Sequence, residues 1–147
     1  MKNIILPVRF GLTASAVLIA YFLILALFDK HTNPVFSFFN AAITAFGIFE
    51  TVRYYKLEQG EKFTYTGGFV AGIITGVIAT FSFTIFFLLY ITEINPDFLP
   101  KLLEVVNVGA SVSVGVLTFV VWIMGIATTV ISAFTVMQYF KKSWNVC

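Results

Sequence analysis

The residues able to carry acid-base, metal or nucleophilic chemistry are few and far apart in this chain of 147 residues. His31 is the only histidine and Cys147 the only cysteine, whereas a metal site needs several ligands and a nucleophilic cysteine needs a base. Glu93, Asp97 and Glu104 could form a pair of carboxylates, but charges that keep a surface helix in contact with water are the simpler interpretation. We therefore expect no enzyme, no metal site and no cofactor.

Two small polar residues lie inside an apolar stretch instead. Asn40 and Thr44 are four residues apart and share one face of a helix. The simplest interpretation is a contact between helices in which the amide finds a partner, and the alternative is a position that lines a pore or a substrate site. Coupled transporters usually keep an ionisable residue within the membrane, and the apolar stretches here have none away from their ends. This disfavours a proton-coupled or ion-coupled transporter.

The composition sets the class of protein. The chain is 59% hydrophobic and 11% charged, against about 25% charged in an average soluble domain. The stretch 67–90 carries no charge, and as a helix it would be about 36 Å long, enough to cross a hydrocarbon core of about 30 Å. The formal net charge of +2 is too small to indicate nucleic-acid binding. We expect an integral membrane protein whose first partner is the lipid bilayer.

The hydrophobic pattern predicts an all-α fold, a bundle of four transmembrane helices in a single domain over residues 1–147. The first apolar run is interrupted by Pro7 and Arg9 where a signal peptide would need its core, so we expect an uncleaved first span that begins after them. The four spans are expected at about 10–28, 35–54, 67–91 and 112–139.

The polar stretch 50–66 must leave the hydrocarbon. Glu50 and Arg53 are three residues apart and can pair at the end of the second helix. Gly60 suits a helix end, and Thr66 could cap the third span. We expect a solvated connecting loop, with a docking surface for a cytosolic partner as the alternative.

Two further features belong at the membrane surface. Tyr54, Tyr55 and Trp144 are expected to anchor the chain in the headgroup layers. Asn95 and Pro96 open a segment whose apolar residues fall mainly on one side. This pattern predicts a short interfacial helix in the loop between the third and fourth spans.

Three glycines form the one positive motif. Gly68, Gly72 and Gly76 recur every four residues, which places three positions without side chains along one stripe of the third span. Small residues at this spacing let another helix approach closely. We therefore predict a helix-packing face, whose partner is another helix of the same chain or, as the sharper alternative, a second copy.

The basic residues predict the orientation. Cytoplasmic segments retain Lys and Arg, and alternate loops of a four-span chain divide the nine basic residues into seven and two. The seven are Lys2, Arg9, Arg53, Lys56, Lys62, Lys141 and Lys142, and the two are Lys30 and Lys101. Both termini are therefore expected in the cytoplasm.

The order of these features resembles a known family. The strings FNAAITAFGIFETVRYYK, KFTYTGGFVAGIITGVIA, INPDFLPKL and VMQYFKKS, spread over about 39–143, resemble the uncharacterised bacterial membrane proteins of domain of unknown function 4199. The resemblance implies four helices in the bacterial inner membrane. It implies no activity, no cofactor and no functional residues.

The leading hypothesis for function is a non-enzymatic membrane protein that acts by helix-mediated association with itself or with a partner membrane protein. It depends on the glycine stripe and on the missing chemistry. The alternative is a small transporter or lipid-handling protein with a path between its helices. That alternative depends on Asn40 and on the hydroxyl-rich fourth span, which carries Thr118, Thr128, Thr129, Ser132 and Thr135.

Overall fold

The computed structural model describes residues 2–30, 34–106 and 112–141, and within them the chain is helical with no strand. The all-α prediction is confirmed. The α-helices are α1 (Lys2–Leu27), α2 (Ser37–Gln59), α3 (Tyr65–Leu89), α4 (Phe98–Val106) and α5 (Val114–Phe140). Short turns of 3₁₀ helix occupy Pro34–Phe36 and Gly60–Lys62, and a π-helical turn, Tyr90–Ile94, extends α3.

Three of the described helices are long and apolar enough to cross a membrane. The candidate spans are Ile4–Leu27 in α1, Tyr65–Ile94 in α3 with its π turn, and Val114–Phe140 in α5. The sequence predicts a fourth span in α2, which has 23 residues but does not meet the same standard. The physical reason is the last third of α2, where Glu50, Arg53, Lys56 and Glu58 lower the mean hydropathy.

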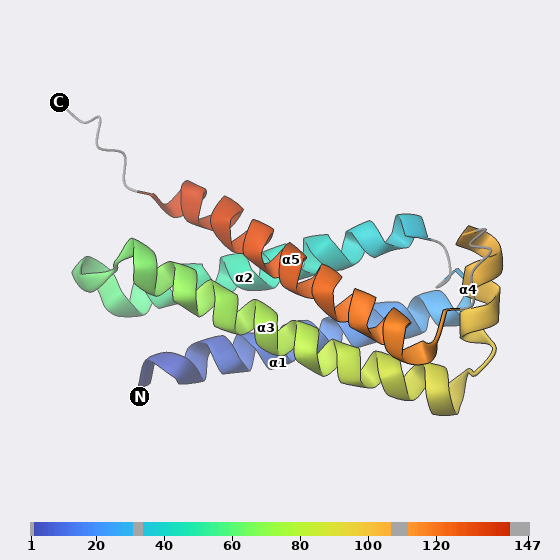
Figure 1. Ribbon diagram of the computed structural model, residues 1–147. Helices are drawn as coiled ribbons and strands as arrows, with labels where there is room; N and C mark the ends of the chain where they lie inside the picture. Colours follow the sequence, from blue (N-terminus) through green and yellow to red (C-terminus); the bar gives the residue numbers. More distant parts are fainter. Residues whose placement is uncertain (1, 31–33, 107–111, 142–147) are drawn as a thin grey trace.

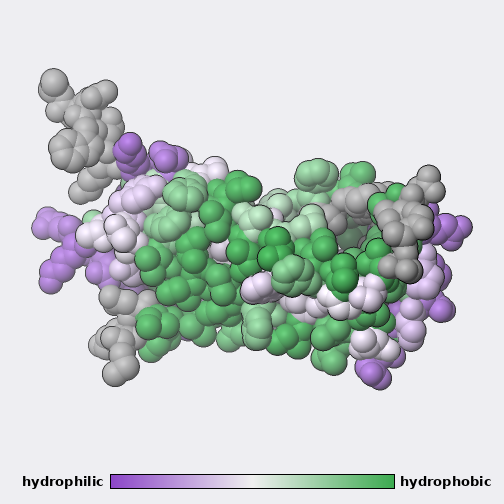
Figure 2. All heavy atoms as spheres, viewed as in Figure 1, coloured by the Kyte–Doolittle hydropathy of each residue, from purple (hydrophilic) through white to green (hydrophobic). Residues whose placement is uncertain are grey.

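The four long helices pack side by side, and α4 lies across one end of them (Figure 1). Packed pairs are α1 with α2 and α3, α5 with α2 and α3, and α2 with α3. We call the end that carries α4 the α4 end. The other end, which we call the α2–α3 end, holds the start of α1, the connection between α2 and α3, and the end of α5. Hydrophilic residues gather at the two ends, and a broad apolar band separates them (Figure 2).

Each end of the bundle has its own cluster of buried side chains. At the α2–α3 end the buried residues are mainly aliphatic: Ile48, Val52, Ala133, Val136 and Met137. At the α4 end they are mainly aromatic: Phe22, Phe87, Tyr90, Ile91 and Phe98.

The connection between α2 and α3 follows from two local features. Gly60 ends α2 with a backbone φ of 52°, a conformation that glycine adopts without steric cost, so the predicted helix end is confirmed. The cap of α3 is Thr64, whose hydroxyl oxygen accepts a hydrogen bond from the Gly67 N–H at 3.2 Å. The prediction of Thr66 as the cap is therefore wrong, because α3 already begins at Tyr65.

The first helix begins earlier than the sequence predicts. α1 starts at Lys2 and continues through Pro7 and Arg9, which were expected to precede it. Proline lacks the N–H that would bond to the carbonyl four residues earlier, which here belongs to Asn3 at the start of the helix, so Pro7 removes only one hydrogen bond of α1. The Pro7 carbonyl also lies 3.2 Å from the Thr75 hydroxyl of α3, a contact that joins the two helices.

Candidate functional site

The glycine stripe of α3 lies buried against α2 and α5 of the same chain. A Cβ placed on Gly68 would come within 3.0 Å of the Phe63 ring, and one placed on Gly72 would lie 3.0 Å from the Ile48 Cγ2 atom. At Gly76 the added atom would overlap a side chain of α5. The stripe is therefore occupied by contacts within the chain.

The crossing of α3 and α5 pairs two glycines with two threonines. Thr129 of α5 lies over Gly76 of α3, and Thr80 of α3 lies over Gly125 of α5. The two hydroxyl oxygens are 3.5 Å apart and buried. Each threonine fills the space that the opposite glycine leaves, so the helices approach closely at this level.

A second polar contact joins three helices near the α2–α3 end. The Thr75 hydroxyl of α3 lies 3.0 Å from the Thr51 hydroxyl of α2 and 3.2 Å from the Pro7 carbonyl of α1. Thr51 itself donates to the Gly47 carbonyl at 2.8 Å. These buried hydroxyls replace water as hydrogen-bond partners in an apolar setting.

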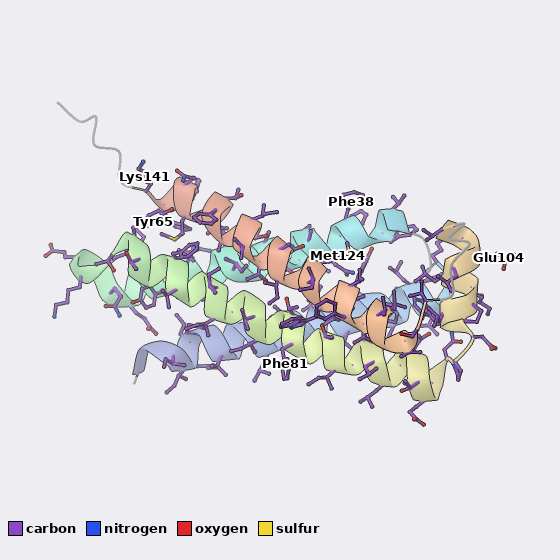
Figure 3. The ribbon with its side chains drawn as sticks, viewed as in Figure 1. Phe38, Tyr65, Phe81, Glu104, Met124 and Lys141 are labelled. Atoms are coloured by element: carbon purple, nitrogen blue, oxygen red, sulfur yellow. The ribbon has the colours of Figure 1, made fainter. Side chains whose placement is uncertain are left out.

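A cavity of about 560 Å³ lies on the α4 side of the crossing. The helices that border it include α2 and α5, which carry the exposed residues Phe38 and Met124 at its edge (Figure 3). Its lining is Leu18, Phe22 and Leu25; Phe36, Phe38, Asn40, Ala41 and Thr44; Thr80, Phe83 and Phe87; Phe98 and Leu102; and Leu117, Val121, Met124, Gly125 and Thr128. Every one of these residues is uncharged, and most are aliphatic or aromatic.

Asn40 carries the buried polar atom of this cavity that has no hydrogen-bond partner among the described residues. That atom is its side-chain oxygen Oδ1. The neighbouring Thr44 hydroxyl donates to the Asn40 backbone carbonyl at 2.9 Å, and the Thr128 hydroxyl donates to the Met124 carbonyl at 2.8 Å. The structure thus places Asn40 and Thr44 on the cavity wall, at the position that the sequence offered as the alternative to a contact between helices.

The short helix α4 closes the cavity at one end. Phe98 is 2% exposed, and its ring centroid lies 5.6 Å from that of Phe87 and 6.2 Å from that of Tyr90. Leu102, one helical turn later, also lines the cavity. At the start of this connection the Asn95 amide donates to the Tyr90 hydroxyl at 3.4 Å. Aromatic packing therefore fastens α4 to the bundle.

A comparison with protein families identifies the family of the chain. The model of a family described as protein of unknown function (DUF4199) matches residues 9–111, which is 103 of the 147 residues. The chain belongs to the DUF4199 family. The resemblance seen in the sequence is confirmed. No curated protein and no solved structure matches the chain.

The matched part of this DUF4199 chain covers most of α1 and all of α2, α3 and α4. Asn40, Thr44, Thr80 and Phe98 therefore fall within it, and the α5 side of the cavity falls outside it. The family description names no ligand, so the chemistry of the cavity depends on the residues themselves.

The remaining predicted residues of the DUF4199 chain lie away from the cavity. Tyr54 is exposed with its ring centroid 5.4 Å from that of Phe10, whereas Tyr55 is buried beside Phe63. Glu50 and Arg53 form the predicted ion pair at 3.3 Å. Trp144, His31 and Cys147 lie outside the described residues.

The carboxylates of the α4 end lie on the surface of the protein. Glu93, Asp97 and Glu104 are exposed. Within the described ranges, no group of three or more histidine, cysteine, aspartate and glutamate side chains could hold a metal ion.

Several hydroxyls of α5 bond back to carbonyls of their own helix. Thr118, Thr128 and Thr135 each donate to the carbonyl four residues earlier, at 2.8 to 2.9 Å. Thr129 differs, because it meets Thr80 across the crossing. One signal could have identified it in advance: Gly125 and Thr129 repeat the spacing of Gly76 and Thr80.

Proposed function

We propose that this protein is a four-span protein of the bacterial inner membrane that binds a lipid-like molecule in the cavity, without catalysis. The observation that carries the proposal is a volume of about 560 Å³ lined by uncharged and mostly apolar side chains. Small-molecule sites in proteins have volumes of about 300 to 1,000 Å³ and mostly apolar walls with a few polar groups. In a bilayer, the molecules that reach such a wall from the side are lipids.

The packing of α2 supports it as the fourth span. This helix contacts all three candidate spans, and its Ile48 and Val52 are fully buried among them. The charges that lower its hydropathy lie in its last third, which faces the hydrophilic α2–α3 end (Figure 2). A helix held in this way crosses the apolar band together with its neighbours.

The distribution of basic residues supports cytoplasmic termini. Arg9, Arg53, Lys56, Lys62 and Lys141 belong to the α2–α3 end, whereas Lys30 and Lys101 belong to the α4 end. The excess of Lys and Arg marks the cytoplasmic side, so α4 lies at the outer surface.

An interfacial position for α4 agrees with its own residues. Phe98 is buried in the bundle, while Lys101 and Glu104 on the same short helix are exposed. A helix with one apolar side and one charged side is stable at the boundary of hydrocarbon and water.

Lipid binding agrees with the geometry better than passage of a polar solute. A polar solute needs a polar route from one end of the bundle to the other. Between the cavity and the α2–α3 end, the crossing of Gly76 with Thr129 and of Thr80 with Gly125 fills the centre. The glycine stripe no longer supports association with a second copy or a partner protein, since helices of the same chain cover the stripe. Association through another face stays a prediction.

A filled cavity tests the proposal. Ala41→Phe places a ring in the cavity, and Ala42→Phe places the same ring on the neighbouring exposed position of α2. The protein is reconstituted in nanodiscs with a phospholipid that carries a diazirine on its acyl chain, and crosslinked peptides are identified by mass spectrometry. We expect wild-type crosslinks at cavity residues of α2, α3 and α5, their loss in Ala41→Phe, and their retention in Ala42→Phe. Crosslinks confined to outward-facing residues in the wild type would refute lipid binding in the cavity.

A further inference from the structure

The unpartnered oxygen of Asn40 identifies the chemical class of the ligand. We propose that the cavity holds an uncharged lipid with a hydroxyl group, and that this hydroxyl donates a hydrogen bond to Asn40 Oδ1. The inference rests on the lipid binding proposed above, which it narrows to one class of lipid. Long-chain alcohols, prenols and acylglycerols share this chemistry.

The unpartnered oxygen of Asn40 has a cost in the free energy of folding. A buried acceptor without a hydrogen bond destabilises the folded protein, and such groups are rare in native structures. Asn40 Oδ1 is buried and accepts no hydrogen bond from the described part of the chain. The Thr44 hydroxyl, one helical turn later, uses its single proton on the Asn40 backbone carbonyl at 2.9 Å. A donor from outside the chain fits this position.

The uncharged lining of the cavity favours an uncharged ligand. The residues that line the cavity are uncharged, so a phosphate or carboxylate held inside would have no counter-ion. Burial of an unpaired charge in an apolar site is strongly unfavourable. A cation near the edge is Lys30, whose Nζ lies 6.0 Å from the ring centroid of the lining residue Phe36, and it is exposed. An uncharged donor is therefore favoured at Asn40, and an anion beside Lys30 is the competing arrangement.

Other hydroxyls of the cavity wall already have hydrogen-bond partners. Thr128 donates to the Met124 carbonyl at 2.8 Å, and Thr80 lies 3.5 Å from Thr129, so both have partners. Asn40 is thus the lining residue whose buried polar atom lacks a partner in the described part of the chain. The rest of the wall would contact the alkyl portion of the lipid.

Three probes of equal chain length test this proposal: hexadecanol, its methyl ether and hexadecanoic acid. Each competes in nanodiscs against a diazirine-labelled hexadecanol, whose crosslinks to cavity residues are measured by mass spectrometry. We expect the wild type to bind the alcohol roughly tenfold more tightly than the ether, which lacks the donor. In Asn40→Leu this preference should fall to about one, with ether binding retained. Thr128→Val, which alters another polar residue of the same wall, should keep the wild-type ratio.

The outcomes separate this inference from the proposed function. Equal binding of alcohol and ether to the wild type overturns the hydroxyl contact and leaves lipid binding intact. The hydroxyl contact is likewise overturned if Asn40→Leu keeps the preference, or if the acid binds best and Lys30→Gln removes its advantage. Failure of every probe to compete refutes the proposed function and this inference together. The wild-type ratio of alcohol to ether needs no variant, so the test does not depend on how Asn40→Leu folds.

Discussion

The two ends of the bundle differ in the size of the side chains between their helices. Toward the α2–α3 end, Gly72 meets Ile48 and Gly76 meets Thr129, so backbones come close and little space remains. Toward the α4 end, rings separate the helices, with the Phe22 centroid 4.9 Å from that of Tyr90 and 6.1 Å from that of Phe83. The cavity lies at this second end.

This difference shows how one small bundle can be both rigid and hollow. Lipid tails are as apolar as the helix surfaces, so helix association in a bilayer depends on close van der Waals packing and on interhelical hydrogen bonds. The small residues and paired threonines supply both at the α2–α3 end. Aromatic rings have fixed shapes and preferred edge-to-face contacts, so they hold helices apart without filling all the space between them. Close packing fills the first region, and the rings of the second leave the cavity between the helices.

The largest expected effect comes from removing an aromatic ring at the α4 end. Phe98→Ala deletes a side chain that is 2% exposed and contacts the rings of Phe22, Phe87 and Tyr90. We expect a loss of about 3 kcal/mol in the free energy of unfolding, because the ring leaves a void that the fixed aromatic neighbours cannot close. SDS-induced unfolding of the reconstituted protein measures it.

The matched control is Phe81→Ala on the outward face of α3, where the ring is 57% exposed. Its effect should stay within about 0.5 kcal/mol, as for other surface substitutions. Equal losses for the two variants would show that α4 is not fastened by the Phe98 ring.

The next largest effect comes from adding one methyl group at the other end. Gly76→Ala places a Cβ where the Thr129 side chain lies, and we expect a loss of about 2 kcal/mol from overpacking. Gly115→Ala is the control, because in the described part of the chain its added Cβ would meet nothing within 4 Å beyond its chain neighbours and its own helix backbone. The same unfolding assay should show no loss for the control.

A second substitution sharpens this prediction. Thr129→Ala removes Cγ2 and Oγ1, the two atoms nearest to the new methyl group, so the double variant Gly76→Ala with Thr129→Ala should be more stable than the sum of the two single changes predicts. Strict additivity would mean that the two residues do not share one contact, and the comparison between the ends would lose its main example.

The sequence predicted those parts of the fold that depend on local pattern. Apolar runs predicted long helices, Gly60 marked the end of α2, and the spacing of Glu50 and Arg53 predicted their pair. The start of α1 was missed, because Pro7 was expected to precede the helix, whereas it lies near the helix start and removes only the hydrogen bond to the carbonyl four residues earlier. The residue type alone does not show where in a helix a proline lies.

The candidate site was predicted only as an alternative. Asn40 and Thr44 were expected first as a contact between helices, since a polar side chain in a span usually finds a partner. Whether it does depends on the space between the helices, which Leu18 of α1, Phe83 of α3 and Met124 of α5 border together with α2. A residue's own neighbours in sequence do not determine this spacing.

The smallest expected effect comes from removing a hydroxyl that contacts neighbouring helices. It is compared with the removal of a hydroxyl that bonds to a carbonyl of its own helix. Thr75→Val removes a hydroxyl that lies 3.0 Å from both the Thr51 hydroxyl and the Ala71 carbonyl of its own helix and 3.2 Å from the Pro7 carbonyl, and it keeps the shape of the side chain. Hydrogen bonds between membrane helices contribute about 0.6 kcal/mol on average, so we expect a loss of that size in the unfolding assay.

The matched control for this last change is Thr128→Val at the cavity wall, whose hydroxyl bonds to the Met124 carbonyl of its own helix. Such a bond slightly opposes regular helix geometry, so its removal should leave stability unchanged or raise it. If Thr128→Val were the more damaging change, the wall hydroxyls would be holding the cavity open. The hydroxyls of the cavity wall would then contribute to stability, and the hollow end would not differ from the packed end in this respect.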